Sequence, residues 1–374
     1  MNDAKVRLGV VGCGGFGMFT LQQFIQDSRI ELAAIGGTTR KEAEKVAARY
    51  GVQHTSDATA VFENPDVELV YINTPPSLHA SQCIAALTAG KHVIVEKPLA
   101  VKLSDAERIV ALAESKNLVC VANLMQRYNP VTQRVAAVLE SGALGQPLYA
   151  SLENHAVDEG LATEHWFWDL DVSGGIFIEH GVHFFDLAAW WFGDLQVLSA
   201  GASKRPSDNK FDQVWCDARS GDGALFRFYH GFNQPSKLER QVWRLTCERG
   251  TIEMNGWIPL EIHIEALVTD ASTRTLTQLL PGYRLNVYES FGPTHKVRGH
   301  GVWSDVEQKI TLDWSPGIEK QPLYCELLRR MLDDQLTFIA DRSHQRVIGE
   351  QNGLASLRMA VDATRAAGLP IDAT

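Results

Sequence analysis

Short apolar runs alternate with helix-like patterns through the first third of the chain. Strands are predicted at 6–11, 30–35, 67–72, 92–95 and 118–122, each bounded by turn-forming or charged residues. Between them, the spacing of apolar positions predicts helices that end near 26 and that span 40–50, 79–89 and 104–115. Strands and helices that alternate in this way predict a parallel, doubly wound α/β sheet.

The pattern changes after residue 124. A helix at 130–141 and a strand at 148–153 lead into a strand-rich middle, with strands predicted at 195–202, 213–218, 224–232, 241–247 and 261–269. Such a run without intervening helices indicates a mainly antiparallel sheet. Helices are predicted at 322–340 and 350–367, whereas 282–317 mixes Gly, Pro and aromatic residues and has no clear period. We therefore predict a Rossmann domain at 1–124 and an α+β domain at 125–374.

Composition and charge narrow the classes of partner. The chain has 374 residues, of which 45% are hydrophobic, so two well-packed domains are expected. A formal net charge of −10 disfavours binding to nucleic acid or to an anionic membrane surface. The six cysteines form no CxxC pair, and we find neither a signal segment nor an apolar stretch of membrane-spanning length. These features predict a cytoplasmic protein.

A glycine-rich turn follows the first predicted strand. Gly12, Gly14 and Gly17 form the pattern G-x-G-x-x-G, with Gly15 and Phe16 between the last two glycines. In such a turn the first glycine allows the tight bend, the second lets the backbone approach a diphosphate, and the third allows close packing. The helix that follows presents free N–H groups to the anion. The alternative is an ordinary glycine-rich turn, but the strand–turn–helix context predicts a dinucleotide site.

The end of the second strand bears on the choice of cofactor. NAD sites usually place Asp or Glu there, whereas this chain continues from Gly37 into Thr38, Thr39 and Arg40. Two hydroxyls and a guanidinium suit the 2′-phosphate of NADP, which a carboxylate would repel. The sequence therefore favours NADP over NAD, the alternative being that these residues only cap the next helix.

Three further strings resemble one protein family. They are Thr74-Pro75-Pro76-Ser77-Leu78-His79, then Ala89-Gly90-Lys91-His92-Val93-Ile94-Val95-Glu96-Lys97-Pro98, and finally Gly174-Gly175 followed by Glu179, His183 and Asp186. Together they closely resemble the glucose–fructose oxidoreductase / inositol dehydrogenase / MocA family. The similarity spans the first domain and continues to about residue 195.

The resemblance implies a Rossmann domain followed by an open, mainly antiparallel sheet domain. It implies a carbohydrate or polyol substrate, a nicotinamide cofactor and a homodimer or homotetramer formed through the open sheet. The cofactor would lie along the strand ends, with the nicotinamide near Lys97. Residues placed there by the resemblance are Thr74, Pro75, His79, Glu96, Lys97 and Asn123.

The resemblance also assigns catalysis to Lys97, Glu179 and His183, which would contact the substrate as well. Three positions depart from the usual family pattern. Glu179 stands where Asp is usual, Ile176 replaces a third glycine, and Phe167 follows Trp166 where Arg is frequent. These departures affect the substrate rather than the class of reaction.

The same residues make physical sense on a helix at 176–192. Glu179, His183 and Asp186 recur at helical spacing beside an apolar stripe, so we expect them in a cleft or paired with partners. A carboxylate one turn from a histidine can orient the imidazole for proton transfer near neutral pH. The alternative is a satisfied structural pair. Lys97 falls at the carboxyl edge of the sheet, where ligands bind in such folds, although it could be an ordinary solvated charge.

Nearby aromatic and histidine residues suggest two further roles. Trp166 or Trp168 could stack on the apolar face of a sugar ring. His155, His165 and His180 lie close to these positions in sequence, but their spacing matches no standard metal site, so no metal is expected.

The leading prediction is an NAD(P)-dependent oxidoreductase that acts on a secondary hydroxyl or ketone of a sugar, cyclitol or glycoside. Two other functions remain open. One is hydrolysis or elimination of a glycoside through transient oxidation by bound nicotinamide. The other is a non-catalytic sensor of sugar or cofactor on the same fold. Intact Glu96, Lys97, Pro98 and His183 favour an enzyme.

Overall fold

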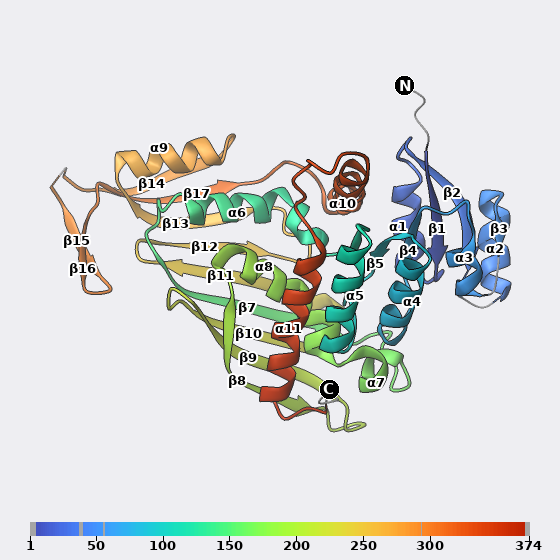
Figure 1. Ribbon diagram of the computed structural model, residues 1–374. Coiled ribbons are helices and arrows are strands. Elements are labelled where there is room, and N and C mark those ends of the chain that lie inside the picture. The colour runs from blue at the N-terminus through green and yellow to red at the C-terminus, as the bar shows by residue number, and fades with distance from the viewer. Residues whose placement is uncertain (1–4, 37–39, 55–56, 293, 371–374) are drawn as a thin grey trace.

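The computed structural model describes residues 5–36, 40–54, 57–292 and 294–370. Within these residues, no helix is long and apolar enough to cross a membrane. The chain forms two large sheets with helices packed between and around them (Figure 1).

The first half is a parallel sheet of six strands within the described residues, in the order β3-β2-β1-β4-β5-β6. This order places the change of winding direction between β1 and β4, where open sheets of this type bind ligands. Central strands such as β4 are buried along their whole length, as expected when helices cover both faces. The elements are β1 (Val6–Val11), α1 (Gly15–Phe24), β2 (Ile30–Gly36), α2 (Arg40–Tyr50), β3 (Gln53–His54), α3 (Ala58–Glu63), β4 (Leu69–Ile72), α4 (Pro76–Thr88), β5 (His92–Val95), α5 (Leu103–Ser115) and β6 (Cys120–Ala122).

The second half is built on a sheet of nine strands among the described residues, in the order β14-β17-β13-β12-β11-β7-β10-β9-β8. All neighbouring pairs are antiparallel except β7 with β10. The predicted mainly antiparallel sheet is therefore confirmed. Its strands are β7 (Pro147–Val157), β8 (Leu195–Lys204), β9 (Phe211–Ser220), β10 (Leu225–Gln234), β11 (Arg240–Cys247), β12 (Gly250–Asn255), β13 (Ile262–Val268), β14 (Arg284–Ser290) and β17 (Gln308–Trp314).

The second half also contains long and short helices. The long ones are α6 (Pro130–Glu140), α8 (Val182–Phe192), α9 (Asp270–Leu279), α10 (Lys320–Ala340) and α11 (Glu350–Ala366). The short ones are η1 (Met125–Tyr128), η2 (Trp166–Trp168), α7 (Leu170–Ser173), η3 (Phe177–Gly181) and η4 (Ser236–Leu238). Figure 1 shows α6, α8 and α11 over the same face. Strands such as β9 and β13 alternate buried and less buried residues, because only one face is covered by helices.

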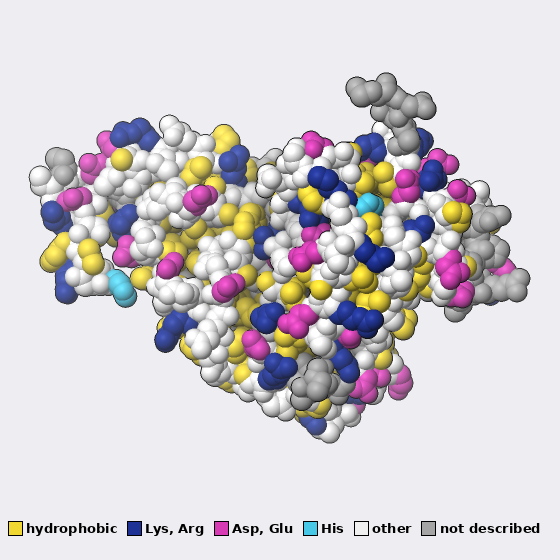
Figure 2. Space-filling view, in the orientation of Figure 1, with side chains coloured by type: hydrophobic (Ala, Val, Ile, Leu, Met, Phe, Trp, Pro, Cys, Tyr) yellow, Lys and Arg dark blue, Asp and Glu magenta, His cyan; other side chains and the backbone are white. Residues whose placement is uncertain are grey.

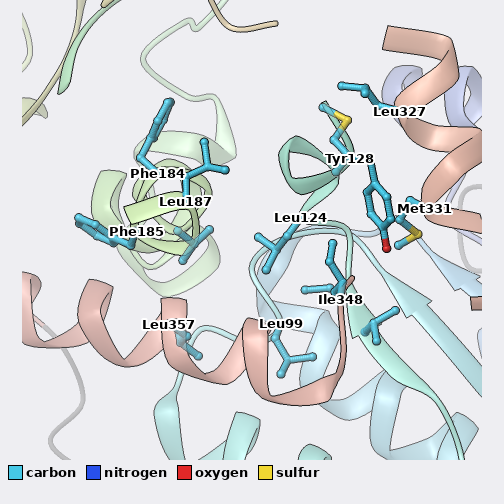
Figure 3. Close-up of a cluster of buried hydrophobic side chains, with 14 of the residues drawn as sticks. Leu99, Leu124, Tyr128, Phe184, Phe185, Leu187, Leu327, Met331, Ile348 and Leu357 are labelled. Atoms are coloured by element: carbon cyan, nitrogen blue, oxygen red, sulfur yellow. The ribbon is translucent and has the colours of Figure 1, made fainter. Parts of the chain in front are cut away.

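The two C-terminal helices join the halves. α11 packs against α5 and β6 of the first half and against α8 and β8 of the second, while α10 packs against α1 and η1. Figure 3 shows the resulting apolar cluster, in which Phe185 of α8, Met331 of α10 and Leu357 of α11 take part. This shared core fixes α8 relative to the strand ends of the parallel sheet. The proposed division of the chain at residue 124 stays a prediction.

The region without a clear sequence period, 282–317, is made of strands. β14 and β17 form one end of the large sheet, and β15 (Lys296–Gly299) and β16 (Val302–Asp305) form a separate hairpin that projects from the molecule (Figure 1). Val302 and Trp303 of this hairpin are more than half exposed. Figure 2 shows hydrophobic and basic side chains together at this end of the molecule. Other elements without a predicted counterpart are β3, α3, β12 and α9.

Candidate active site

A cavity of about 670 Å³ opens at the carboxyl edge of the parallel sheet. Residues from both halves of the chain line it, which follows from the packing of α8 and α10 beside the strand ends. The lining includes Phe16, Asn73, Lys97, Trp166, His183 and Tyr324.

The glycine-rich turn forms one end of this site. Gly12 has φ +95°, and a Cβ there would lie 2.2 Å from the carbonyl oxygen of Asn73. A Cβ on Gly17 would lie 1.8 Å from the amide nitrogen of the Asn73 side chain, so Gly17 makes room for this residue of the neighbouring strand end. At the start of α1, a Cβ on Gly14 would meet only the Asn73 amide nitrogen, at an ordinary contact distance of 3.6 Å, and a Cβ on Gly15 would have no neighbour within 4 Å. A diphosphate can therefore approach the helix N-terminus without obstruction.

The other proposed cofactor residues are distributed around this edge. Phe16, Thr74, Glu96 and Asn123 line the cavity, and Pro75 is exposed beside it. His79 does not fit the role of a direct contact, because it is fully buried.

Instead, His79 holds two loops together. Its ring nitrogens lie 2.7 Å from the carbonyl oxygen of Pro98 and 2.8 Å from that of Thr74. It thus fixes the segment that carries Lys97. Thr38 and Thr39 lie outside the described residues, and Arg40 begins α2, but its side chain is not described.

Glu96 is buried beneath the cavity in a polar network. The Tyr71 hydroxyl and the Asn123 amide donate hydrogen bonds to the same carboxylate oxygen, at 2.6 and 2.9 Å. Burial raises the pKa of Glu96, while these hydrogen bonds and the charge of Lys97 act in the opposite direction. The network ties the ends of β4, β5 and β6 together directly behind Lys97.

Lys97 and Glu179 form an ion pair across the two halves. The Lys97 ammonium donates to the Glu179 carboxylate and, at 2.8 Å, to the Glu179 backbone carbonyl. Both side chains are mostly buried, and both line the cavity. The peptide bond between Lys97 and Pro98 is cis. The ion pair therefore places the Lys97 ammonium, from the first half of the chain, against the π-helical turn η3 of the second half.

His183 lies at the start of α8, and 5% of its surface is exposed. Burial, together with the positive charge of Lys97, lowers its pKa well below the usual range. Its Nδ1 has no hydrogen-bond partner among the described residues, so the expected orientation of His183 by Glu179 is not what the structure shows. Its nearest aromatic neighbour is Trp257, whose ring centroid is 4.7 Å away at an angle of 75°.

A second buried ion pair holds α8 in place. Arg127 of η1 donates two hydrogen bonds, of 2.8 and 2.9 Å, to the Asp186 carboxylate one turn after His183. Burial raises the pKa of Asp186, and the Arg127 charge opposes this shift. Asp186 therefore ties α8 to η1 through its pairing with Arg127.

Replacing Arg127 with methionine should lower the free energy of unfolding by about 3–5 kcal/mol, because one charge of a buried pair would lose its partner. Urea denaturation measures this change. Arg358→Met is a matched control, because the Arg358–Glu107 pair is about half exposed and should contribute less than about 1 kcal/mol. Equal effects of the two substitutions would contradict the assignment.

Other histidines lie near the site. Among the described residues, no group of three or more His, Cys, Asp or Glu side chains is placed to hold a metal ion. His180 lines the cavity, and burial lowers its pKa well below the usual range. His230 is buried beneath it, and burial lowers its pKa to about 3. His155 faces Glu153, at 3.6 Å.

Several lining residues could not have been found from local sequence. Trp257 lies in the turn after β12, and Arg240 begins β11, far along the chain from the glycine-rich turn. Tyr324 of α10 packs its ring against Phe16 and Phe19 of α1, at 6.1 and 5.3 Å between centroids. These contacts depend on the packing of the halves, for which the sequence carries no spacing signal.

The glycines before η3 explain one departure from the family pattern. Gly174 and Gly175 have φ values of +78° and +86°, which favour glycine, whereas Ile176 has ordinary helical angles. A third glycine is therefore not required by the backbone.

Comparison with known proteins gives two family matches. Residues 6–124 match the model described as "Oxidoreductase family, NAD-binding Rossmann fold", and residues 132–253 match the "GFO/IDH/MocA C-terminal domain". These matches cover most of both sheets.

Individual proteins show the same relationship. The chain is 30% identical to a dTDP-3,4-didehydro-2,6-dideoxy-alpha-D-glucose 3-reductase of Streptomyces violaceoruber over 74% of this chain and 81% of that protein. It is 27% identical to scyllo-inositol 2-dehydrogenase (NAD(+)) of Bacillus subtilis over 58% of this chain, which spans 62% of that relative. A 3-ketoreductase from Actinomadura kijaniata in complex with NADP and TDP-benzene has a similar fold, with a TM-score of 0.73, 20% identity and coverage of 97% and 98% of the two chains.

Proposed function

This chain belongs to the GFO/IDH/MocA family of oxidoreductases, and from that membership we propose that it transfers a hydride between a nicotinamide cofactor and a sugar, cyclitol or glycoside. The reacting group would be a secondary hydroxyl or the corresponding ketone. The observation that supports this function best is the meeting of Lys97, Glu179 and His183 at the cavity beside the glycine-rich turn.

When bound, the nicotinamide accepts or supplies the hydride. The residues of the chain bind the substrate oxygen and move its proton. Lys97 can donate a hydrogen bond to that oxygen, and Glu179 holds the Lys97 ammonium in place. His183 is neutral at pH 7 because its pKa is lowered, so it can accept the hydroxyl proton during oxidation. In the reverse direction, a protonated His183 would return the proton to the ketone.

A substrate panel tests this proposal. Sugars, cyclitols and glycosides are incubated with NAD⁺ and NADP⁺, and the absorbance of the reduced nicotinamide is followed. Net formation of reduced cofactor with at least one such compound is expected. Cleavage of a glycoside without net cofactor consumption would support hydrolysis or elimination instead, and binding of ligands without turnover of any compound would support a sensor.

We also propose that NADP(H) binds more tightly than NAD(H). β2 ends at Gly36, and no carboxylate follows it before Arg40. A carboxylate at this place would favour NAD by bonding the ribose hydroxyls and repelling the 2′-phosphate.

The substitution Gly37→Asp should reverse this preference, because it introduces that carboxylate. Titration of each cofactor, followed by fluorescence or calorimetry, measures the ratio of the two dissociation constants. The ratio is expected to favour NADP in the natural protein and NAD in the variant. Equal or tighter binding of NAD by the natural protein would show that the proposed preference is wrong.

For assembly, we propose a homodimer or homotetramer formed through the uncovered face of the large sheet, and a cytoplasmic location. Support comes from large side chains that are at least two fifths exposed on the strands of this sheet, among them Tyr149, Leu198 and Leu225. Analytical ultracentrifugation would contradict the assembly by showing a monomer at micromolar concentration, and cell fractionation tests the location.

A further inference from the structure

The lining of the cavity is not limited to the proposed reacting groups. It also includes the segment after β7, Phe232 of β10 and the beginning of β11. These residues supply aromatic rings and charged side chains from the second half of the chain. We call this part of the lining the second compartment; it belongs to the same cavity of about 670 Å³ as Lys97, Glu179 and His183.

Trp166 is the exposed member of an aromatic run in this wall. The next two residues are core: Phe167 is 6% exposed and packs on Phe232 with 4.6 Å between centroids, and Trp168 is 5% exposed. Trp166 is 37% exposed and lines the cavity. An exposed indole on a cavity wall is costly in water but suits stacking against a ring.

The segment that carries Trp166 is held firmly in place. The Trp168 indole donates to the carbonyl oxygen of Leu161 at 3.0 Å, and the Arg205 guanidinium lies over the Trp168 ring at 4.3 Å. Arg205 also pairs with Asp208, which accepts a hydrogen bond from Thr163 at 2.8 Å. Trp166 is thus presented from a pre-organised loop, which reduces the entropy lost when a ligand stacks on it.

Charged groups stand at the same compartment. Arg240 lines the cavity with neighbouring Glu239 and Gln241, and its side chain is 63% exposed. Its nearest carboxylate, on Glu153, is 3.8 Å away and also lies 3.7 Å from Arg244. Arg240 therefore keeps N–H donors for a ligand. An aromatic face combined with donors and acceptors suits a ring that carries polar substituents.

We propose that the substrate carries a second ring, which stacks on Trp166 and accepts hydrogen bonds from Arg240, while its first ring reacts beside His183. The preferred substrate is then a glycoside rather than a free monosaccharide. This inference rests on the proposed function and narrows its substrate class. The second ring can be aromatic or a second sugar: both offer an apolar face to Trp166, and hydroxyl substituents on either ring can accept hydrogen bonds from Arg240.

Three derivatives of the sugar oxidised fastest in the panel test the proposal: the methyl glycoside, the phenyl glycoside and a disaccharide. At least one of the ring-bearing compounds should have a kcat/KM about tenfold above that of the methyl glycoside, mainly through KM. The better of the two identifies the kind of ring. In Trp166→Ala this advantage should fall about tenfold. Trp303→Ala, which removes an exposed indole from the remote β15–β16 hairpin, should retain it.

The result that would overturn the inference is distinct from failure of the proposed function. No advantage of either ring-bearing compound, or an advantage that Trp166→Ala leaves unchanged, would show that the compartment does not bind a second ring. If the natural protein oxidised no compound at all, the proposed function would fail. Calorimetry would then measure the dissociation constants of the phenyl glycoside and the disaccharide for the natural protein and for Trp166→Ala. Weaker binding to the variant would support the second-ring site independently of turnover, and equal binding would overturn it.

Discussion

Replacing His183 with alanine should lower kcat by about 10²–10⁴-fold while the cofactor still binds, because this is the usual contribution of a general base. His183 is 5% exposed and faces the cavity beside Lys97. Its lowered pKa keeps it neutral at pH 7, which suits removal of a hydroxyl proton. The residue is not required for the glycine-rich turn, so binding of NADP should be retained.

Steady-state kinetics and a cofactor titration measure these two effects. His263→Ala is the matched control: this histidine is about half exposed on the large sheet and pairs with Asp313. It should have normal turnover. Near-normal turnover of His183→Ala would transfer the role of base to Lys97.

The pH dependence provides a second check on the same residue. Oxidation requires neutral His183, and its lowered pKa moves the loss of activity on acidification below the ordinary imidazole pKa of about 6.5. The rate of oxidation should therefore stay level as the pH falls from 8 to about 6.5. A rate of oxidation that already falls at pH 6.5 or above in the natural protein, but not in His183→Ala, would contradict this prediction. It would show that the His183 imidazole is not buried in the working enzyme.

The sequence predicted the parts of the fold that depend on local pattern. The five predicted strands of the parallel sheet and the glycine-rich turn have clear periods or fixed spacing, and the structure confirms them, with β3 as an additional short edge strand. α3, β12 and α9 were missed, and 282–317 had no assignment; within that region β14 and β17 pair in the large sheet, whereas β15 and β16 pair only with each other. Register and edge pairing of this sheet depend on contacts between distant strands.

At the candidate active site, the prediction from the sequence failed where it assumed regular α-helical spacing. Spacing of four residues in an α-helix places Glu179 beside His183, but 177–181 form a π-helical turn. The wider turn changes which side chains share a face, and Glu179 contacts Lys97 of the other half instead. His79 was expected at the cofactor because it belongs to a recognisable string, although its burial gives it a supporting role.

The second large effect is expected for Lys97→Met, which should lower kcat by about 10²-fold or more, because it removes the donor to the reacting oxygen. Methionine retains much of the side-chain volume but has no charge. Circular dichroism and urea denaturation are needed alongside the kinetics, because Glu179 would be left partly buried without its partner. A folded variant with near-normal kcat would show that Lys97 is only a structural charge.

Glu179 decides how this lysine acts. Glu179→Gln preserves shape but removes the negative charge, and it should lower kcat by about tenfold, less than the loss in Lys97→Met, if the carboxylate serves to hold the ammonium. In that case the double variant should resemble Lys97→Met alone, since the effects of partners that act as a unit are not additive.

Glu179→Asp adds a separate readout, because it shortens the side chain that lines the cavity. If Glu179 also contacts the substrate, as the sequence suggested, Glu179→Asp should raise KM and change the ranking of substrates without altering cofactor affinity. A fall in kcat alone, with ranking and KM preserved, would limit Glu179 to positioning Lys97. Effects of Lys97→Met and Glu179→Gln that simply add would mean that the ion pair has no joint role in turnover.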